Sequence, residues 1–208
     1  MEVNYKLQIL QQPIRAKVFP LDDKQRRPVD PPPILELIVD GNLKTEINFR
    51  APFLTCMCSL WDEERKVNYT HVDFVRIVST SEGNLEKIEK VDYLMGSLVS
   101  PSYNLIDLNG LDKVYFIFPD ISVRKEGKYC LKFTLMDLLG SPMASIPQLT
   151  QTKGKIVNEI FSDTFVVQPI SEFLGMMESS ELAKSLASQG VKLPVRNSHN
   201  PRPNISEE

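Results

Sequence analysis

Short runs of alternating apolar and polar residues, separated by turn residues, dominate this chain. Alternation over about four to eight residues is the pattern of a half-buried β-strand. The pattern predicts strands at Tyr5 to Leu10, Ile34 to Val39, Phe53 to Trp61, Met95 to Val99, Val114 to Phe118, Tyr129 to Leu135 and Phe161 to Val167. Asp40-Gly41 ends one strand, and Glu126-Gly127-Lys128 predicts a hairpin. Many short strands favour an antiparallel β-sandwich, with an immunoglobulin-like sandwich as the leading case.

One segment near the C-terminus has helical periodicity instead. Residues 178 to 189 carry a leucine pair at i,i+4 spacing, with Ser179 or Ser180 as the candidate N-cap and Gly190 as the candidate C′ residue. Residues 194 to 208 are polar and proline-rich, and a mobile tail is expected there. The predicted fold class is therefore mainly β, with a single C-terminal helix.

The middle of the chain gives a weaker pattern. Residues 65 to 92 are expected to form an insertion or a long excursion, in which Val72 to Val78 is compatible with a strand. Glutamate and lysine at i,i+3 and i,i+4 spacing predict a short exposed helix over Leu85 to Tyr93. Prolines, glycines and small polar residues predict a loop at residues 140 to 155.

Composition places the chain among soluble globular proteins, with 42% hydrophobic and 25% charged residues. No apolar run approaches the roughly 20 residues that a membrane helix needs. The N-terminus opens with an acidic residue and alternates like a strand, unlike a signal peptide. The formal net charge is −3, so any binding to nucleic acid must depend on a local basic patch.

The cysteines indicate a reducing compartment, because they are three in number and follow no secretion signal. Cys56 and Cys58 lie two residues apart in a strand-like run, so both thiols are expected on one face and buried, as is Cys130. A metal site needs further ligands, and His71 and His199 do not lie at ligand spacing. We therefore predict no metal site.

The sequence contains no nucleophile elbow, phosphate loop, dinucleotide fingerprint or zinc-hydrolase motif. Acidic runs such as Asp62-Glu63-Glu64 and Asp22-Asp23 are typical of a solvated face. We predict a protein that is not an enzyme, with no catalytic residue, no cofactor and no small-molecule substrate. The alternative to this prediction is a carboxylate-based hydrolase, which requires converging acids in a deep pocket.

Two basic clusters stand out against this acidic background. The first lies in a loop of residues 13 to 33 and comprises Arg15, Lys17, Lys24, Arg26 and Arg27, opposed by Asp22 and Asp23. The second comprises Arg124, Lys125 and Lys128, opposed by Glu126. Prolines 31 to 33 stiffen the end of the first cluster. Charge alone favours an ordinary solvated face, and binding of nucleic acid is the alternative.

Several blocks of the sequence resemble the velvet domain of fungal regulators and follow that family's order. The blocks are Gln11-Gln12-Pro13, DKQRRPVDPPPI at residues 23 to 34, LMGSLVS at 94 to 100, FIFPDISVRKEGKYCLKF at 116 to 133, Ile160 to Phe165, Phe173 to Met176 and Gln189 to Leu193. They span nearly the whole chain, so we expect one velvet domain over residues 1 to 193. Residues 65 to 92 correspond to a region of variable length in the family.

The resemblance implies a Rel/NF-κB-like immunoglobulin fold and a role in regulating fungal sporulation, development and secondary metabolism. It also implies residence in the nucleus and the cytoplasm, and homodimers or heterodimers with other velvet proteins. In DNA-binding members the basic loop ahead of the proline block contacts DNA. The matching positions here are Lys24, Arg26 and Arg27, with Arg15 and Lys17 in support.

Two hypotheses follow. The first is a regulator that recognises double-stranded DNA as a velvet dimer, with phosphate contacts from lysines and guanine contacts from Arg26 or Arg27. The alternative is a velvet adaptor that recruits partners and binds DNA weakly or only through its partner. Asp22, Asp23 and the acidic net charge favour the alternative. Neither hypothesis involves a membrane.

Overall fold

The computed structural model describes residues 4–19, 26–39, 50–80, 83–139 and 154–197, with the backbone alone at 74–80 and 83–89. Four predicted features therefore lie outside the described residues: Asp40-Gly41, most of the loop at 140–155, the tail beyond residue 197, and Lys24 with its acidic neighbours.

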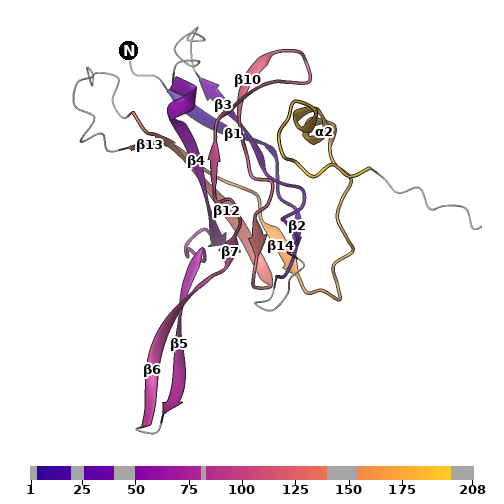
Figure 1. Ribbon diagram of the computed structural model, residues 1–208. Helices are drawn as coiled ribbons and strands as arrows, with labels where there is room; N and C mark the ends of the chain where they lie inside the picture. The colour runs from indigo at the N-terminus through magenta and orange to yellow at the C-terminus, as the bar shows by residue number, and fades with distance from the viewer. Residues whose placement is uncertain (1–3, 20–25, 40–49, 81–82, 140–153, 198–208) are drawn as a thin grey trace, which may run out of the picture.

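Two β-sheets form the body of the molecule (Figure 1). The first sheet has the order β1 (Tyr5–Gln11), β3 (Ile34–Val39), β10 (Asp112–Ile117) and β9 (Tyr103–Ile106). The second has the order β2 (Arg15–Lys17), β14 (Phe165–Gln168), β12 (Gly127–Asp137), β4 (Leu54–Asp62) and β8 (Val99–Pro101), with β13 (Lys155–Phe161) also paired to β12. The described pairings are antiparallel except for that of β14 with β2. The predicted mainly β, antiparallel fold is confirmed.

The core lies between the two sheets, which makes the fold a sandwich. Phe116 from the first sheet shares one buried cluster with Phe133 and Phe165 from the second. Each fully buried side chain of this size stabilises the fold by about 1.5–3 kcal/mol relative to exposure. A short 3-10 helix, Ala51–Phe53, leads into β4 and places Ala51 in the same core.

The alternating pattern of β4 buries its cysteines as predicted. Leu54, Cys56, Cys58 and Leu60 all point into the core. Burial raises the pKa of the Cys56 and Cys58 thiols above their ordinary value, so both stay protonated at neutral pH. Cys130 is also buried, and its thiol donates a hydrogen bond to the carbonyl of Asp62. The expectation of buried, free cysteines is confirmed.

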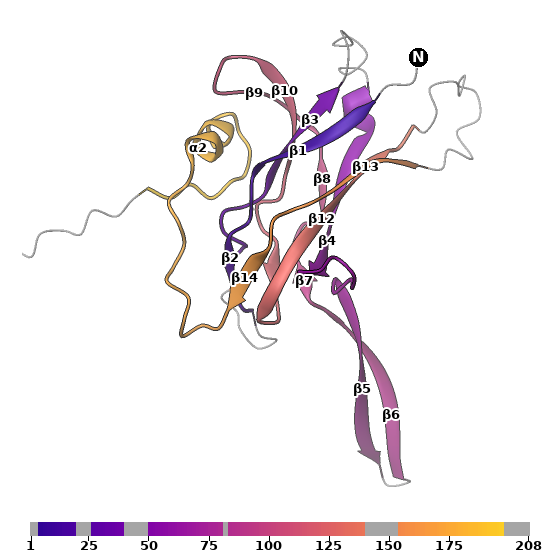
Figure 2. The same ribbon diagram turned by 180° about the vertical axis from the view of Figure 1, so that it is seen from behind.

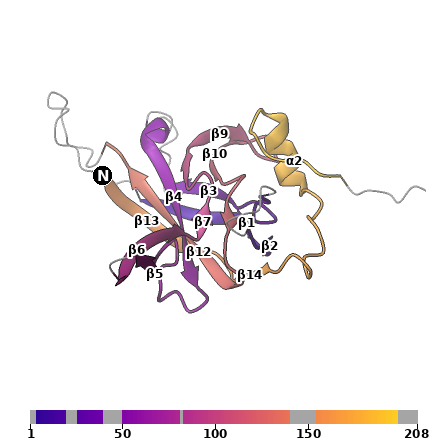
Figure 3. The same ribbon diagram turned by 60° about the horizontal axis from the view of Figure 1, so that its bottom comes forward.

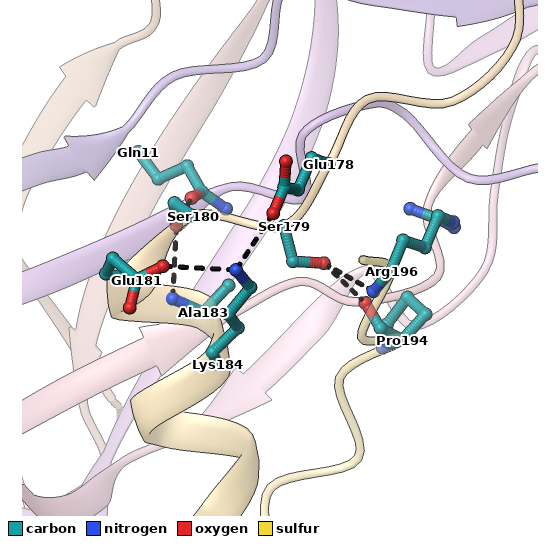
Figure 4. Close-up of polar contacts among 9 residues, drawn as sticks. All are labelled: Gln11, Glu178, Ser179, Ser180, Glu181, Ala183, Lys184, Pro194 and Arg196. Carbon is teal, nitrogen blue, oxygen red and sulfur yellow. Dashed lines mark hydrogen bonds and ion pairs between the residues drawn. The ribbon is translucent and has the colours of Figure 1, made fainter. Parts of the chain in front are cut away.

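The outer face of the first sheet is covered by helix α2 (Glu181–Ser188). Ala183 and Leu186 pack against Ile34 and Tyr115 in a second buried cluster. Of the two candidate N-caps, Ser180 has this role, since its hydroxyl accepts a hydrogen bond from the Ala183 amide (Figure 4). Within the described residues no helix is long and apolar enough to cross a membrane.

The segment just after the helix is also ordered, in contrast to the predicted tail from residue 194. The Arg196 amide donates to the Ser179 hydroxyl, and that hydroxyl donates to the Pro194 carbonyl (Figure 4). The Ser179 amide donates in turn to the Arg196 carbonyl. The start of the predicted tail is thus paired with the residues that precede α2.

A long hairpin projects from one end of the sandwich (Figures 1 and 2). It consists of β5 (His71–Thr80) and β6 (Gly83–Asp92), paired continuously from His71 with Asp92 to Thr80 with Gly83. The excursion predicted at residues 65–92 is therefore a hairpin, and the helix predicted over 85–93 was wrong. Exposed helical ion pairs stabilise a helix by only about 0.2–0.5 kcal/mol each, and here they do not outweigh the continuous pairing of this segment with β5.

The predicted hairpin at residues 126–128 was also wrong. The short strand β11 (Ser122–Val123) pairs with β7 (Leu94–Met95), whereas β12 begins at Gly127 and pairs with β4, β13 and β14. The Arg124 amide extends the first pairing by donating to the Tyr93 carbonyl. The chain therefore changes sheets at this point instead of turning back on itself.

Two of the predicted strands are interrupted. Met95 to Val99 divides into β7 and β8, and Phe161 to Val167 divides into β13 and β14. In the second gap, buried Ser162 keeps the ladder intact, because its amide donates to the Leu131 carbonyl and its hydroxyl accepts from the Leu131 amide. A side chain thus replaces a backbone partner where the strand bends.

Asp30 joins the start of the chain to its end. Its side chain is only 2% exposed, and its carboxylate lies 3.9 Å from Arg15 Nε and 3.5 Å from Arg196 Nη1. The same carboxylate accepts a 2.5 Å hydrogen bond from the Met177 amide. The Asp30 backbone exchanges hydrogen bonds with that of Arg15. One buried charge therefore fixes β2, the proline segment and the C-terminal segment together.

Replacing Asp30 with alanine is expected to lower the free energy of unfolding by roughly 3 kcal/mol, since truncating a buried ion pair leaves its partners uncompensated. Arg15 and Arg196 are partly exposed, which limits the loss. Urea denaturation measures the change, and Asp163→Ala is the control because Asp163 is exposed. The control is expected to shift stability by no more than about 0.5 kcal/mol. Equal losses in the two variants would contradict the assigned role of Asp30.

Candidate nucleic-acid interface

Three segments that are distant in sequence meet at one end of the sandwich, which is turned forward in Figure 3. We call this the basic end and define it as residues 26–30, 93–97 and 119–125. The Val29 amide donates to the Ile121 carbonyl at 2.7 Å, and the Ser122 hydroxyl donates to the Arg27 carbonyl at 2.8 Å. These contacts hold residues 26–30 against residues 119–125. The pairing of β7 with β11 joins residues 93–97 to the same end.

Arg26 lies in this end with its guanidinium against an acid. Its Nη2 is 3.2 Å from Oδ2 of Asp120, and the two side chains are 35% and 41% exposed. An exposed ion pair of this kind contributes about 0–1 kcal/mol to stability. The contact therefore directs the guanidinium without burying it, and Arg26 stays open to a ligand.

Asp120 is itself held in place by Ser97. The Ser97 amide donates to Asp120 Oδ1 at 2.9 Å, and the Ser97 hydroxyl lies 3.3 Å from Oδ2. Gly96 makes this approach possible, because its φ of +115° suits glycine and a Cβ there would lie 2.5 Å from the Asp120 carbonyl oxygen. The position of Asp120 is thus set by contacts that do not involve Arg26.

Arg27 presents its side chain to solvent while its backbone is anchored through Ser122. Its neighbour Pro28 is half-buried, and Val29 is fully buried in the core. The basic loop is therefore attached to the sandwich immediately after Arg27. This arrangement places two exposed guanidinium groups on a short, anchored segment.

Aromatic rings flank the second basic cluster. Arg124 stacks over the Phe19 ring at 5.2 Å, and Lys125 lies over Tyr93 at 5.7 Å. The Phe19 amide donates to the Val123 carbonyl, which brings the first basic loop against the second cluster. Within the described residues, Arg124 Nε and Nη1 are buried and form no hydrogen bond. The ring stacking therefore accounts for the position of this arginine.

The remaining predicted site residues are placed differently. Arg15 faces the buried Asp30 and stacks on Phe173 at 5.6 Å, so its guanidinium takes part in the fold. Lys17, in β2, is half-buried. Lys128 is exposed at the start of β12 and lies 3.8 Å from Glu63, which belongs to the turn after β4. The structure thus brings together Arg26, Arg27, Arg124 and Lys125, and it gives Arg15 a structural contact.

The chemistry of the basic end is that of an anion-binding surface. The side chains of Arg26, Arg27 and Lys125 are exposed there, and guanidinium and ammonium groups of this kind bind phosphates. Among the described residues, no group of three or more histidine, cysteine or acidic side chains is placed to hold a metal ion.

Ser97, Asp120 and Phe19 are further parts of the site that were not predicted from the sequence. Ser97 and Asp120 lie in two of the blocks that carry the velvet resemblance, which was an available signal. Asp120 follows a proline in a turn-like context, so its local sequence indicated a bend and nothing more. Its contact with Arg26 spans 94 residues of sequence and is visible only in the folded chain.

Replacing Gly96 with alanine is expected to destabilise the protein by roughly 3 kcal/mol, because it combines an unfavourable φ with a clash against Asp120. Gly110→Ala is the matched control, since Gly110 also has positive φ but has open space around it. That control is expected to cost about 1–2 kcal/mol, from backbone strain alone. Urea denaturation of both variants gives the difference. If Gly96→Ala were no worse than Gly110→Ala, the packing of Gly96 on Asp120 would not matter to the fold.

Comparison with known proteins identifies the family. The Velvet factor family model matches residues 5–90 and 76–200. The chain is 32% identical over 196 residues to the spore development regulator RYP2 of Ajellomyces capsulatus, covering 93% of this chain and 43% of that protein. It is 34% identical to the sexual development regulator umv3 of Mycosarcoma maydis, covering 93% and 45%, and 34% identical to the spore development regulator vosA of Beauveria bassiana, covering 90% and 64%. The chain thus spans less than two thirds of the length of these relatives. It belongs to the velvet family.

Proposed function

We propose that this protein is a developmental regulator that binds double-stranded DNA sequence-specifically through its basic end and acts in the nucleus as a velvet dimer. Three curated relatives are named as regulators of spore or sexual development, which supports the regulatory role. The observation that carries the DNA-binding part is that Arg26 and Arg27 of the first cluster lie at the same end of the sandwich as Arg124 and Lys125 of the second. Loops on a rigid scaffold are well suited to recognition.

The proposed contacts divide into two kinds. Lys125, together with Lys24 of the loop that carries Arg26 and Arg27, supplies phosphate contacts, which give affinity and register without sequence information. Arg26 and Arg27 are the candidates for base recognition, because a guanidinium fork matches the O6 and N7 acceptors of guanine in the major groove. Both are exposed and lie on an anchored segment, so ordering them on DNA costs less than ordering free side chains.

A second candidate function is an adaptor that dimerises, recruits partners and contacts DNA weakly or through its partner. The formal charge of −3 favours this candidate, as does the carboxylate of Asp120 within the basic end itself. The two candidates differ in one measurable property, which is whether the isolated protein retains specific DNA fragments with a salt-dependent affinity.

Binding to genomic fragments, followed by fluorescence anisotropy on a retained duplex at two salt concentrations, tests the proposal. Arg26→Ala and Arg27→Ala are each expected to weaken binding to the preferred sequence by about 1–3 kcal/mol and to relax specificity at one position. Lys125→Ala is expected to weaken binding to all duplexes alike and to lower the salt slope by about one.

The matched control is Lys6→Ala, which removes an exposed positive charge from the far end of β1. It is expected to leave both affinity and salt slope unchanged. If Arg26→Ala and Arg27→Ala behaved like this control, the basic end would not be the DNA-binding surface. If the unmodified protein retained no fragment at either salt concentration, the adaptor function would be favoured.

The proposed dimer is tested separately, by sedimentation velocity of the protein with and without the retained duplex. The expected result is two protein chains per duplex, because one chain offers few exposed cations against an overall acidic charge. The stoichiometry follows from the mass of the complex. A complex with a single chain bound at full affinity would contradict the dimer and leave DNA binding itself intact.

A further inference from the structure

We propose that Asp120 is a positioning residue that sets the sequence discrimination of the basic end by holding Arg26 for contact with a base instead of a phosphate. This inference rests on the proposed DNA-binding function and adds to it a determinant of specificity. The observation behind it is the contact of Arg26 Nη2 with Asp120 Oδ2 at 3.2 Å across an exposed part of the surface.

The acid is held more firmly than an ordinary surface carboxylate. Both of its oxygens have contacts with Ser97, one of them from a backbone amide. Its backbone lies against Gly96, where even a methyl group has no room. Asp120 is thus a fixed acceptor, and the Arg26 side chain takes its position from Asp120.

The backbones on either side of this pair are tied together as well. After Arg26, the Arg27 carbonyl accepts a hydrogen bond from the Ser122 hydroxyl, and the Val29 amide donates one to the Ile121 carbonyl. Ile121 and Ser122 are the two residues that follow Asp120. The spacing of the two segments is therefore set by main-chain contacts, and the Arg26 side chain bridges a gap of fixed width. Such a bridge removes part of the conformational freedom that an arginine loses when it binds.

The geometry leaves the arginine able to recognise a base. The contact with Asp120 uses Nη2, and a guanidinium carries five N–H donors. A planar group held along one edge can still direct further N–H groups at the paired acceptors of guanine.

The charge of Asp120 also acts on the competing contact. A carboxylate beside Arg26 repels the phosphate backbone and cancels part of the positive potential that draws any duplex to this surface. A base edge carries no net charge and meets no such repulsion. Asp120 is therefore expected to weaken non-specific binding while supporting specific binding, and both effects raise the ratio of the two affinities.

The experiment measures this ratio with a retained genomic duplex and an unrelated duplex of equal length, by anisotropy at one fixed salt concentration. Asp120→Asn removes the charge but keeps an oxygen that can accept from the Ser97 amide. The variant is expected to bind the unrelated duplex as well as the unmodified protein does, or up to about threefold more tightly. Its discrimination ratio is expected to fall by about fivefold to tenfold.

Two further variants separate positioning from a structural effect. Asp112→Asn removes the same charge from the exposed start of β10, and it is expected to leave the ratio unchanged. In an Arg26→Ala background, Asp120→Asn is expected to lower discrimination by no more than the roughly threefold gain in non-specific binding, because the positioning part of its effect passes through Arg26. Mere damage to the fold would lower binding to both duplexes together and persist in the Arg26→Ala background.

The outcomes distinguish the inference from the function on which it rests. If the unmodified protein discriminates and Asp120→Asn discriminates equally well, the inference is overturned and DNA binding stands. An undiminished effect of Asp120→Asn in the Arg26→Ala background would also overturn it. If the unmodified protein binds both duplexes equally, the proposed sequence-specific function fails, and the inference fails with it.

Discussion

The buried carboxylate of Asp30 is the constraint from which the arrangement of the chain follows. It receives a backbone amide and two arginines from segments at opposite ends of the sequence, in a position almost closed to solvent. A buried ion pair is weak evidence for added stability, since desolvation offsets much of the attraction. It is stronger evidence for a defined arrangement, because displacing any one segment removes one of the donors that compensate the buried charge.

The segments that Asp30 brings together are the ones that carry the basic loop. Asp30 lies near the end of this loop, directly before the prolines of residues 31–33, which continue into β3. Arg15 holds the other end of the same loop through β2. The loop is thus closed by one buried contact at its base, while Val29 and Arg27 bind to the strand segment at 121–122. The backbone that carries the exposed Arg26 and Arg27 is therefore held in place by the buried residues Val29 and Asp30.

Local sequence signals were sufficient wherever a neighbouring residue decides the structure. The bounds of β3 follow from its apolar run, and the helix follows from its leucine pair, whereas only the structure distinguishes Ser180 from Ser179 as the N-cap. The helix predicted over 85–93 failed because charged residues at helical spacing also fit an exposed strand, and only pairing with β5 decides between them. Sheet order had no local signal, and so the hairpin predicted at 126–128 failed as well.

The candidate site shows the same division. Charge clusters were visible in the sequence, but a count of charges does not tell an exposed cation from one that serves the core. Arg15 and Arg26 look alike in the sequence, yet one reaches a carboxylate that is 2% exposed and the other a carboxylate that is 41% exposed. The first contact fixes the fold, and the second leaves the guanidinium at the surface. Burial of the partner is therefore the property that separates them, and it depends on the whole tertiary structure.

Acidic residues near a proposed DNA-binding surface need not count against DNA binding. The quantity that matters to a regulator is the ratio between specific and non-specific affinity, because non-specific sites are far more numerous. Non-specific binding is almost wholly electrostatic, so an acidic chain and a carboxylate within the basic end reduce it most. Contacts to base edges depend on geometry and lose less. The combination seen here, a few exposed cations on an anchored loop in a protein of net charge −3, is therefore consistent with selective binding at modest affinity. Two linked copies would restore the affinity without sacrificing the selectivity.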